Sequence, residues 1–163
     1  MATDVYMQID GIKGESTDSE HKDWIELLSF NHAISQPASA TANSAGGGTV
    51  ARCQHSDYSI TKYVDLASPK LYEMCSNGKH IKSVNIEMMR ASGDKRVKYM
   101  EVKMEQVVIS HVAPAGGSDF PSEAISFNYG TIKWTYTQQK RADGSQGGNT
   151  TGGWSLVENK VAA

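Results

Sequence analysis

Cysteine is scarce in this sequence, since its 163 residues contain only Cys53 and Cys75. Two cysteines allow at most one bridge, and their separation is not that of a CxxC metal or redox pair. An excess of either charge is also lacking, because 16 basic residues stand against 18 acidic ones and leave a formal net charge of −2. A nearly neutral chain has no overall attraction to nucleic acid, so we expect no nucleic-acid partner.

Long hydrophobic runs are absent as well. No stretch approaches the about 18 apolar residues that a membrane span needs. The start of the chain, Met1–Tyr6, lacks the basic segment and apolar run of a secretion signal. We therefore expect that the protein folds in the reducing cytoplasm and does not insert into a membrane. If it leaves the cell, another machine must carry it.

Enzyme signatures are missing too. The chain has no HExxH, GxSxG, P-loop or GxGxxG pattern, and the glycines at 46–48 lack the strand-to-helix setting of a phosphate cradle. The mixed charges between Glu15 and Asp23 are typical of a solvated loop or of salt bridges at a rim. The five histidines are dispersed: His21, His32, His55, His80 and His111. We expect no catalytic residue, no cofactor and no metal site, and the sequence indicates a protein that is not an enzyme.

Alternation with period two is what the sequence does show. Such alternation is typical of strands with one buried face, so it predicts a mainly β fold. The apolar members of the alternating runs are Val5, Met7, Ile9; Val84, Ile86, Met88; Met100, Val102, Met104; Ile125, Phe127, Tyr129; and Ile132, Trp134, Tyr136. The last two runs meet at Gly130, which predicts two strands or one strand bent there.

Three segments, 25–34, 58–64 and 107–112, carry bulky residues on both faces. Burial on both sides, in a barrel wall or against another subunit, accounts for that pattern.

One short helix is expected at about residues 69–77. Ser68 can cap its start, Pro69 suits its first position, and Gly78 is placed to end it. Its apolar face is formed by Leu71, Met74 and Cys75.

Two segments predict loops. Residues 37–49 contain no large apolar side chain and cannot offset their ordering entropy by burial, so we expect a flexible loop. Residues 142–153 are rich in glycine and predict a soft loop, after which the segment from Trp154 to Val157 returns as a short final strand. The expected architecture is a single domain spanning 1–163, an antiparallel β-barrel or two-sheet barrel of about eight strands with one short α-helix.

Four aromatic residues offer a rival interpretation: Trp24, Trp134, Tyr136 and Trp154. They could form the stacking platform of a ligand- or carbohydrate-binding β-sandwich protein, although core or interface positions are more typical in alternating strands. A small hydrolase is a third interpretation, disfavoured by the lack of a nucleophile–base pair.

Several short motifs, in order, resemble one family along nearly the whole chain. The most specific are DGIKGES at 10–16, SQ at 35–36 and SPKLYEMCSNGKH at 68–80; further pieces lie at 108–110, 116–118, 126–130, 134–136 and 142–144. On these motifs the chain resembles the Hcp (haemolysin-coregulated protein) family of type VI secretion systems. It departs from many relatives at Ser29–His32, where they carry tryptophans.

The resemblance implies a structural subunit that assembles with itself into a homohexamer, and rings that stack into the ejected inner tube. It implies as partners the spike protein and contractile sheath of the apparatus, and effector proteins held in the lumen. It also implies a protein that is cytoplasmic before firing and then secreted to the extracellular space or a target cell without a signal peptide. Six domains of this length in a hexagon leave a hole of about 40 Å.

Two site hypotheses follow. Alternation places Ser29 and Asn31 on one face of their strand, small and polar as a water-filled wall requires, so we predict that they contact cargo in the lumen. The flexible loop suggests a ring-stacking contact, formed by Ala45, Gly46, Gly47, Gly48 and Thr49.

Overall fold

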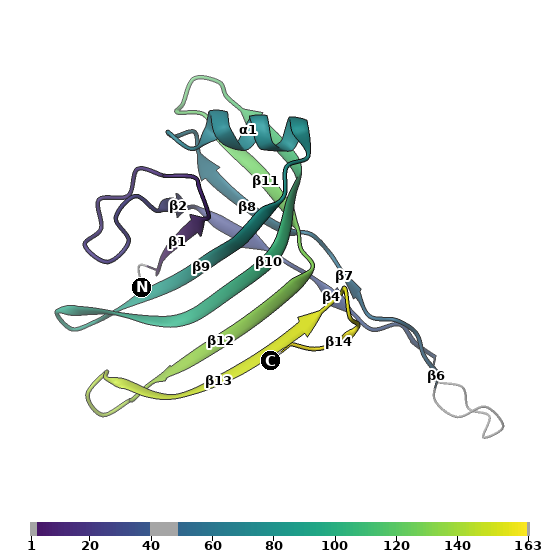
Figure 1. The fold of residues 1–163 in the computed structure, drawn as a ribbon. Coiled ribbons are helices and arrows are strands. Elements are labelled where there is room, and N and C mark those ends of the chain that lie inside the picture. The colour runs from purple at the N-terminus through teal and green to yellow at the C-terminus, as the bar shows by residue number, and fades with distance from the viewer. Residues whose placement is uncertain (1–2, 40–48, 163) are drawn as a thin grey trace.

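The computed structural model describes residues 3–39 and 49–162 and is mainly β with one helix, as the sequence predicts (Figure 1). Its elements are β1 (Thr3–Ile9), β2 (Ile25–Leu27), β3 (Ser29–Asn31), β4 (Ile34–Ser35), β5 (Ala38–Ser39), β6 (Thr49–Val50), β7 (Gln54–His55), β8 (Tyr58–Tyr63), α1 (Ser68–Asn77), β9 (Ile81–Ser92), β10 (Lys95–Ala115), β11 (Ser122–Asn128), β12 (Thr131–Gln139), β13 (Gln146–Ser155) and β14 (Lys160–Val161).

The long strand β10 organises the sheet. It pairs with β9 along one side, and along the other it pairs first with β12 and then with β11. β11 and β12 therefore follow one path beside β10, interrupted at Gly130, whose N–H donates to the carbonyls of Glu105 and Gln106. Of the two predicted alternatives, two strands rather than one bent strand are present, because β11 ends at Asn128 and β12 begins at Thr131. A Cβ at Gly130 would lie 2.4 Å from Oε1 of Gln106, so a larger residue here would require the Gln106 side chain to move.

The sheet closes on itself at the end that carries α1. From β10 the pairing runs through β11 and β8 to β3, and in the other direction through β9 and β1 to β2. Leu28 joins β2 to β3, and its N–H donates to the carbonyl of Thr61 at 2.8 Å, so the two short strands complete the wall. Every pairing is antiparallel, which confirms an antiparallel barrel. At the other end β12, β13 and β14 leave the barrel as an open extension.

The core follows the alternation. Met7, Ile86 and Met104 are fully buried in the barrel, and so are Ile125 and Phe127. The helix covers one end of the barrel and buries Leu71 and Met74 against it (Figure 1).

The ends of the helix agree with the sequence only in part. Gly78 ends it in the left-handed conformation, with φ of 64°, as expected. The start differs, because Ala67 occupies the N-cap position without a side-chain hydrogen bond and Ser68 is already inside the helix. The Ser68 hydroxyl instead donates to Glu123 at 2.7 Å, inside the barrel wall.

The expected loop at 37–49 begins and ends as a hairpin. β4 pairs with β7 and β5 with β6, so two chain segments run side by side away from the barrel (Figure 1). We call residues 32–39 and 49–56 the arm, and residues 32–37 and 51–56 its root. Thr49 pairs with Ser39, whereas Ala45, Gly46, Gly47 and Gly48 lie outside the described residues.

The expectation of a soft loop over 142–153 is wrong for most of its length. Only a tight turn is present, closed by the bond from Lys140 N–H to the Ser145 carbonyl, and β13 begins at Gln146. Its glycines and threonines pair with β12 through the backbone, which requires no apolar side chains. Trp154 and Ser155 end β13 rather than forming a separate strand, and the final short strand is β14.

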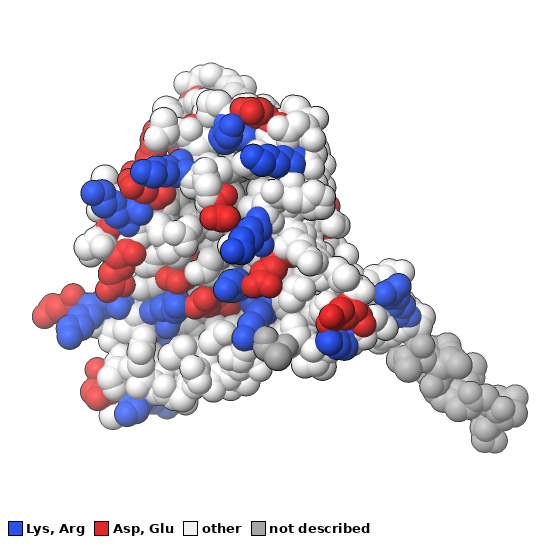
Figure 2. All heavy atoms as spheres, in the orientation of Figure 1, with Lys and Arg blue, Asp and Glu red and all other residues white. Residues whose placement is uncertain are grey.

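Figure 2 shows acidic and basic side chains interspersed over the face that it presents. Among the described residues, no helix has the length and apolar character that crossing a bilayer requires.

Candidate functional site

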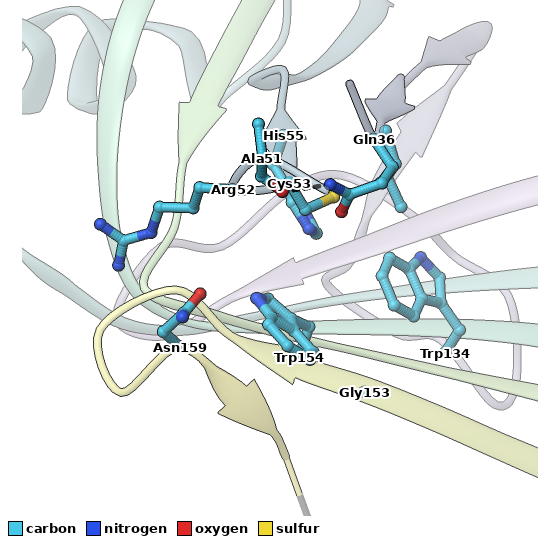
Figure 3. Close-up of a pocket in the computed structure, with 10 residues that line it drawn as sticks. Gln36, Ala51, Arg52, Cys53, His55, Trp134, Gly153, Trp154 and Asn159 are labelled. Carbon is cyan, nitrogen blue, oxygen red and sulfur yellow. Dashed lines mark hydrogen bonds between the residues drawn. The ribbon is translucent and has the colours of Figure 1, made fainter. Parts of the chain in front are cut away.

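A cleft lies between the arm root and the open extension of the sheet. Its volume is about 550 Å³. Figure 3 shows Trp134 and Trp154 on the sheet side, with Gln36, Cys53 and His55 on the arm side. The remaining lining residues are Ile34, Ala51, Arg52, Gly153 and Asn159. None of the lining residues is acidic.

The aromatic platform of the rival interpretation is not assembled. Trp134 and Trp154 share the cleft, but Trp24 packs edge-on against His21 with ring centroids 4.8 Å apart. Tyr136 is exposed elsewhere on β12.

The arm root is tied to the barrel through Tyr129, a buried residue in the turn between β11 and β12. The phenol oxygen of Tyr129 lies 2.6 Å from Nε2 of His32 and 2.9 Å from Nδ1 of His55. His32 precedes β4 and His55 lies in β7, so each chain segment of the arm contributes one imidazole. Burial lowers the pKa of His32, and the neighbouring His55 lowers it further. Burial also lowers the pKa of His55, and it raises the pKa of Tyr129.

Two groups of large apolar side chains are exposed, far apart on the chain's surface. We group seven of these side chains by their place in the fold: Leu28, Tyr63, Leu66 and Phe120 form the helix-side patch, and Ile34, Val157 and Val161 form the arm-side patch. Phe30 and Tyr136 are exposed outside both groups. The rings of Tyr63 and Phe120 meet edge-on at 5.8 Å, and Phe120 is 69% exposed. Val161, on β14 beside the cleft residue Trp154, is 70% exposed. In Figure 1, α1 lies at the top of the barrel, whereas β14 lies in the lower part of the view, near the base of the arm.

A buried charged cluster joins the helix to the barrel, and its charged residues are not among the site residues predicted from the sequence. Lys62 of β8 pairs with Glu123 of β11, and its Nζ donates to Glu123 at 2.6 Å, to Asp65 at 2.8 Å and to Ser68 at 3.2 Å. Tyr72 also donates to Glu123. Burial alone would raise the pKa of Glu123, but the bonds from Lys62, Tyr72 and Ser68 outweigh it and leave that pKa below its usual value.

Of the two interpretations of the charged segment between Glu15 and Asp23, the structure has the salt bridges. His21 is buried, stacks on Tyr6 with ring centroids 4.4 Å apart, and lies 2.8 Å from both Asp18 and Glu87. This clamp fixes the loop that follows β1 to strand β9.

The lumen role of Ser29 and Asn31 stays a prediction, because all three residues of β3 are exposed and burial does not separate two faces of this strand. Ser29 and Asn31 are exposed on β3, opposite Thr61 and Ser59 of β8. The predicted two-sided burial of segment 25–34 is not seen in the isolated chain, because Leu28, Phe30 and Ile34 are also exposed. No cluster of three or more histidine, cysteine or acidic side chains suited to a metal occurs within 3–39 and 49–162.

Comparisons with known proteins agree with this structure. Residues 6–136 match the model of the family described as type VI secretion system effector, Hcp. The chain is 32% identical to Protein hcp1 of Pseudomonas aeruginosa strain PAO1 over 164 residues, which cover 99% of this chain and 100% of that one.

Solved structures give the same result. A type six secretion system protein matches with a TM-score of 0.90 at 33% identity, and Hcp1 from Salmonella typhimurium with 0.81 at 30%; each match covers 99% of this chain and 100% of the other. Fold and sequence together define a type VI secretion protein. The chain belongs to the Hcp family, whose members are structural, non-enzymatic secretion proteins.

Proposed function

We propose that this chain is a structural subunit of the type VI inner tube, which assembles into hexameric rings that stack and hold effectors in their lumen. The observation that carries the proposal is the pair of separate apolar patches. A cyclic ring uses a head-to-tail interface, in which one surface of a subunit meets a different surface of its neighbour. The helix-side and arm-side patches are two such surfaces on one chain, and exposed apolar patches mark interaction sites.

In this assembly the spike protein caps the tube, the contractile sheath surrounds it, and effector proteins occupy the lumen. The protein is cytoplasmic before firing and is secreted by the apparatus itself. Family membership supports this route.

Ring closure can be tested by mixing two variants. Phe120→Asp disables the helix-side patch and Val161→Asp disables the arm-side patch, and both side chains are exposed enough to leave the fold intact. Each variant alone should be monomeric in native mass spectrometry. Their mixture should form a dimer and stop there, because only one intact interface can be made. Rings that persist in either single variant would show that the patches do not close the ring.

We also propose that the arm reaches the next ring and stabilises stacking. Its hairpin pairing supports this role, because paired strands hold an extended shape that a loose loop lacks. Deleting residues 38–48 should abolish tubes in negative-stain images while single rings remain, and unchanged tubes would refute the idea.

For the lumen, Ser29 and Asn31 remain our proposed cargo contacts. Asn31→Arg should impair effector retention in pull-downs and leave ring mass unchanged, because the side chain is exposed. Asn149→Arg, at an exposed position of β13, serves as the matched control away from β3. A loss of ring mass in the Asn31 variant would instead show that the position is packed against a neighbour.

A further inference from the structure

Three side chains hold the arm root against the barrel, and their hydrogen bonds depend on protonation. A tyrosine hydroxyl has one proton to donate, and a neutral imidazole has one donor and one acceptor nitrogen. Tyr129 can therefore donate to one of His32 and His55 and accept from the other. When both imidazoles are protonated, both nitrogens that face Tyr129 become donors, and the phenol proton has no imidazole acceptor.

Charge repulsion acts in the same direction. The ring centroids of His32 and His55 are 6.1 Å apart, so two imidazolium ions would face each other at short range. The surroundings favour neutral rings, because His32 also packs on Tyr58 at 5.2 Å and on Trp134 at 6.3 Å. Desolvation by such neighbours disfavours the charged form of an imidazole.

Other titratable groups near His32, His55 and Tyr129 do not offset the cost of charging the two imidazoles. The negative charge of Asp57 acts on Tyr129 and helps to raise the pKa of its phenol. The oxygens of Asp57 already accept hydrogen bonds from Ser110 at 2.6 Å and from Asn128 at 3.0 Å. Within the described residues it makes no hydrogen bond to either imidazole. Cys53 and Arg52 lie on the same arm segment, and Arg52 adds a further cation to the cleft.

We propose that His32, His55 and Tyr129 form an acid-sensitive latch, which holds the arm root on the barrel at neutral pH and releases it on mild acidification while the barrel stays folded. The direction follows from linkage. Both imidazoles have a lowered pKa in the docked state, so docking is at full strength above the ordinary imidazole pKa of about 6.5 and weakens as the pH falls from there toward the lowered values.

The consequence for the tube rests on the proposed function. If arms join adjacent rings, a tube delivered into an acidic compartment would loosen its ring-to-ring contacts and expose its cargo. The latch itself is a property of one chain and is tested without reference to rings.

The test is a distance between arm and barrel measured by double electron–electron resonance. Spin labels are placed by Ser35→Cys on the arm and Lys79→Cys beside the helix, both exposed, with Cys53→Ser and Cys75→Ser as background. Labelled chain is diluted with unlabelled chain, so that every distance is within one subunit. We expect one narrow distribution at pH 7.5 and, at pH 5.5, a population of displaced arms about fivefold larger, the factor for the loss of one ordinary hydrogen bond.

Three variants separate the latch from general acid sensitivity. The double variant H32Q/H55Q keeps a donor and an acceptor at each position but cannot titrate, so its distribution should not change with pH. Y129F removes the shared hydroxyl and should displace the arm about fivefold more often at pH 7.5. The control H111Q, at an exposed histidine of β10, should behave like the unmodified chain.

A distribution unchanged between pH 7.5 and 5.5 would overturn the proposal. So would an equal pH-dependent increase of the displaced population in H32Q/H55Q. A loss of the β-sheet circular dichroism signal together with that increase would also overturn it, because the barrel itself would then be unfolding. Because the distance lies within one chain, these outcomes are independent of whether rings or tubes form.

Discussion

The ammonium group of Lys62 lies 2.6 Å from the carboxylate of Glu123, and neither side chain is exposed to solvent. The two residues are also directly opposed across the β8–β11 pairing. Two buried charges are tolerated only when they neutralise each other and neighbouring groups complete their hydrogen bonds. Here Asp65, Ser68 and Tyr72 are those neighbours. The pair therefore anchors the start of the helix to the barrel wall.

Removing one member of this pair should be strongly destabilising. Lys62→Met leaves Glu123 buried without its counter-charge, and we expect a loss of about 3–5 kcal/mol in the free energy of unfolding. The matched control is Lys70→Met, which breaks the exposed Lys70–Glu73 pair on the same helix and should cost about 0.5 kcal/mol or less. Urea titrations at fixed protein concentration measure both, and equal costs would contradict the assignment.

The His21 clamp predicts a pH dependence. The hydrogen bond from His21 holds the pKa of Asp18 below its usual value. The contribution of Asp18 to stability is therefore full above its unfolded pKa, about 3.9, and is lost as the pH falls through the lower folded value. Asp18→Asn should lower the urea midpoint at pH 7 and flatten its decline between pH 5 and pH 2. A decline as steep as that of the unmodified chain would refute this role.

Gly14 should tolerate no side chain. A Cβ there would lie 2.3 Å from the carbonyl oxygen of Trp24, within the backbone of the clamped loop. Gly14→Ala should therefore cost about 1–3 kcal/mol, the usual range for overpacking. Gly117→Ala is the control, because nothing lies within 4 Å of its Cβ position. Thermal unfolding measures the midpoint temperature of each variant, and the midpoint of Gly14→Ala should be the lower one. Similar midpoints would show that the loop can move aside.

Local pattern was sufficient to predict much of the fold. Alternation identified the buried faces of β1, β9 and β10, and Gly78 was correctly predicted to end the helix. The strand β13 was missed because backbone pairing holds it, so its glycines carry no burial pattern. The prediction of Ser68 as the helix cap was wrong because its hydroxyl binds Glu123, a partner so distant in sequence that local pattern does not reveal it.

The site was less predictable for the same reason. Lys62 and Glu123 stand at inward positions of their alternating strands, with Ile60 and Ile125 as neighbours, and that register is a signal that could have found the pair. His32, His55 and Tyr129 carry no comparable signal. They meet only because the arm root packs against the turn at Gly130, and this contact depends on the pairing of strands that are distant in sequence.

The central claim is that this chain closes into a ring of six. Native mass spectrometry of the unmodified protein tests it most directly, because each subunit weighs 17.7 kDa and the assembly should have six times that mass. We predict one dominant species of that mass at micromolar concentration, with a central hole in negative-stain images. A strictly monomeric protein at high concentration would contradict the claim.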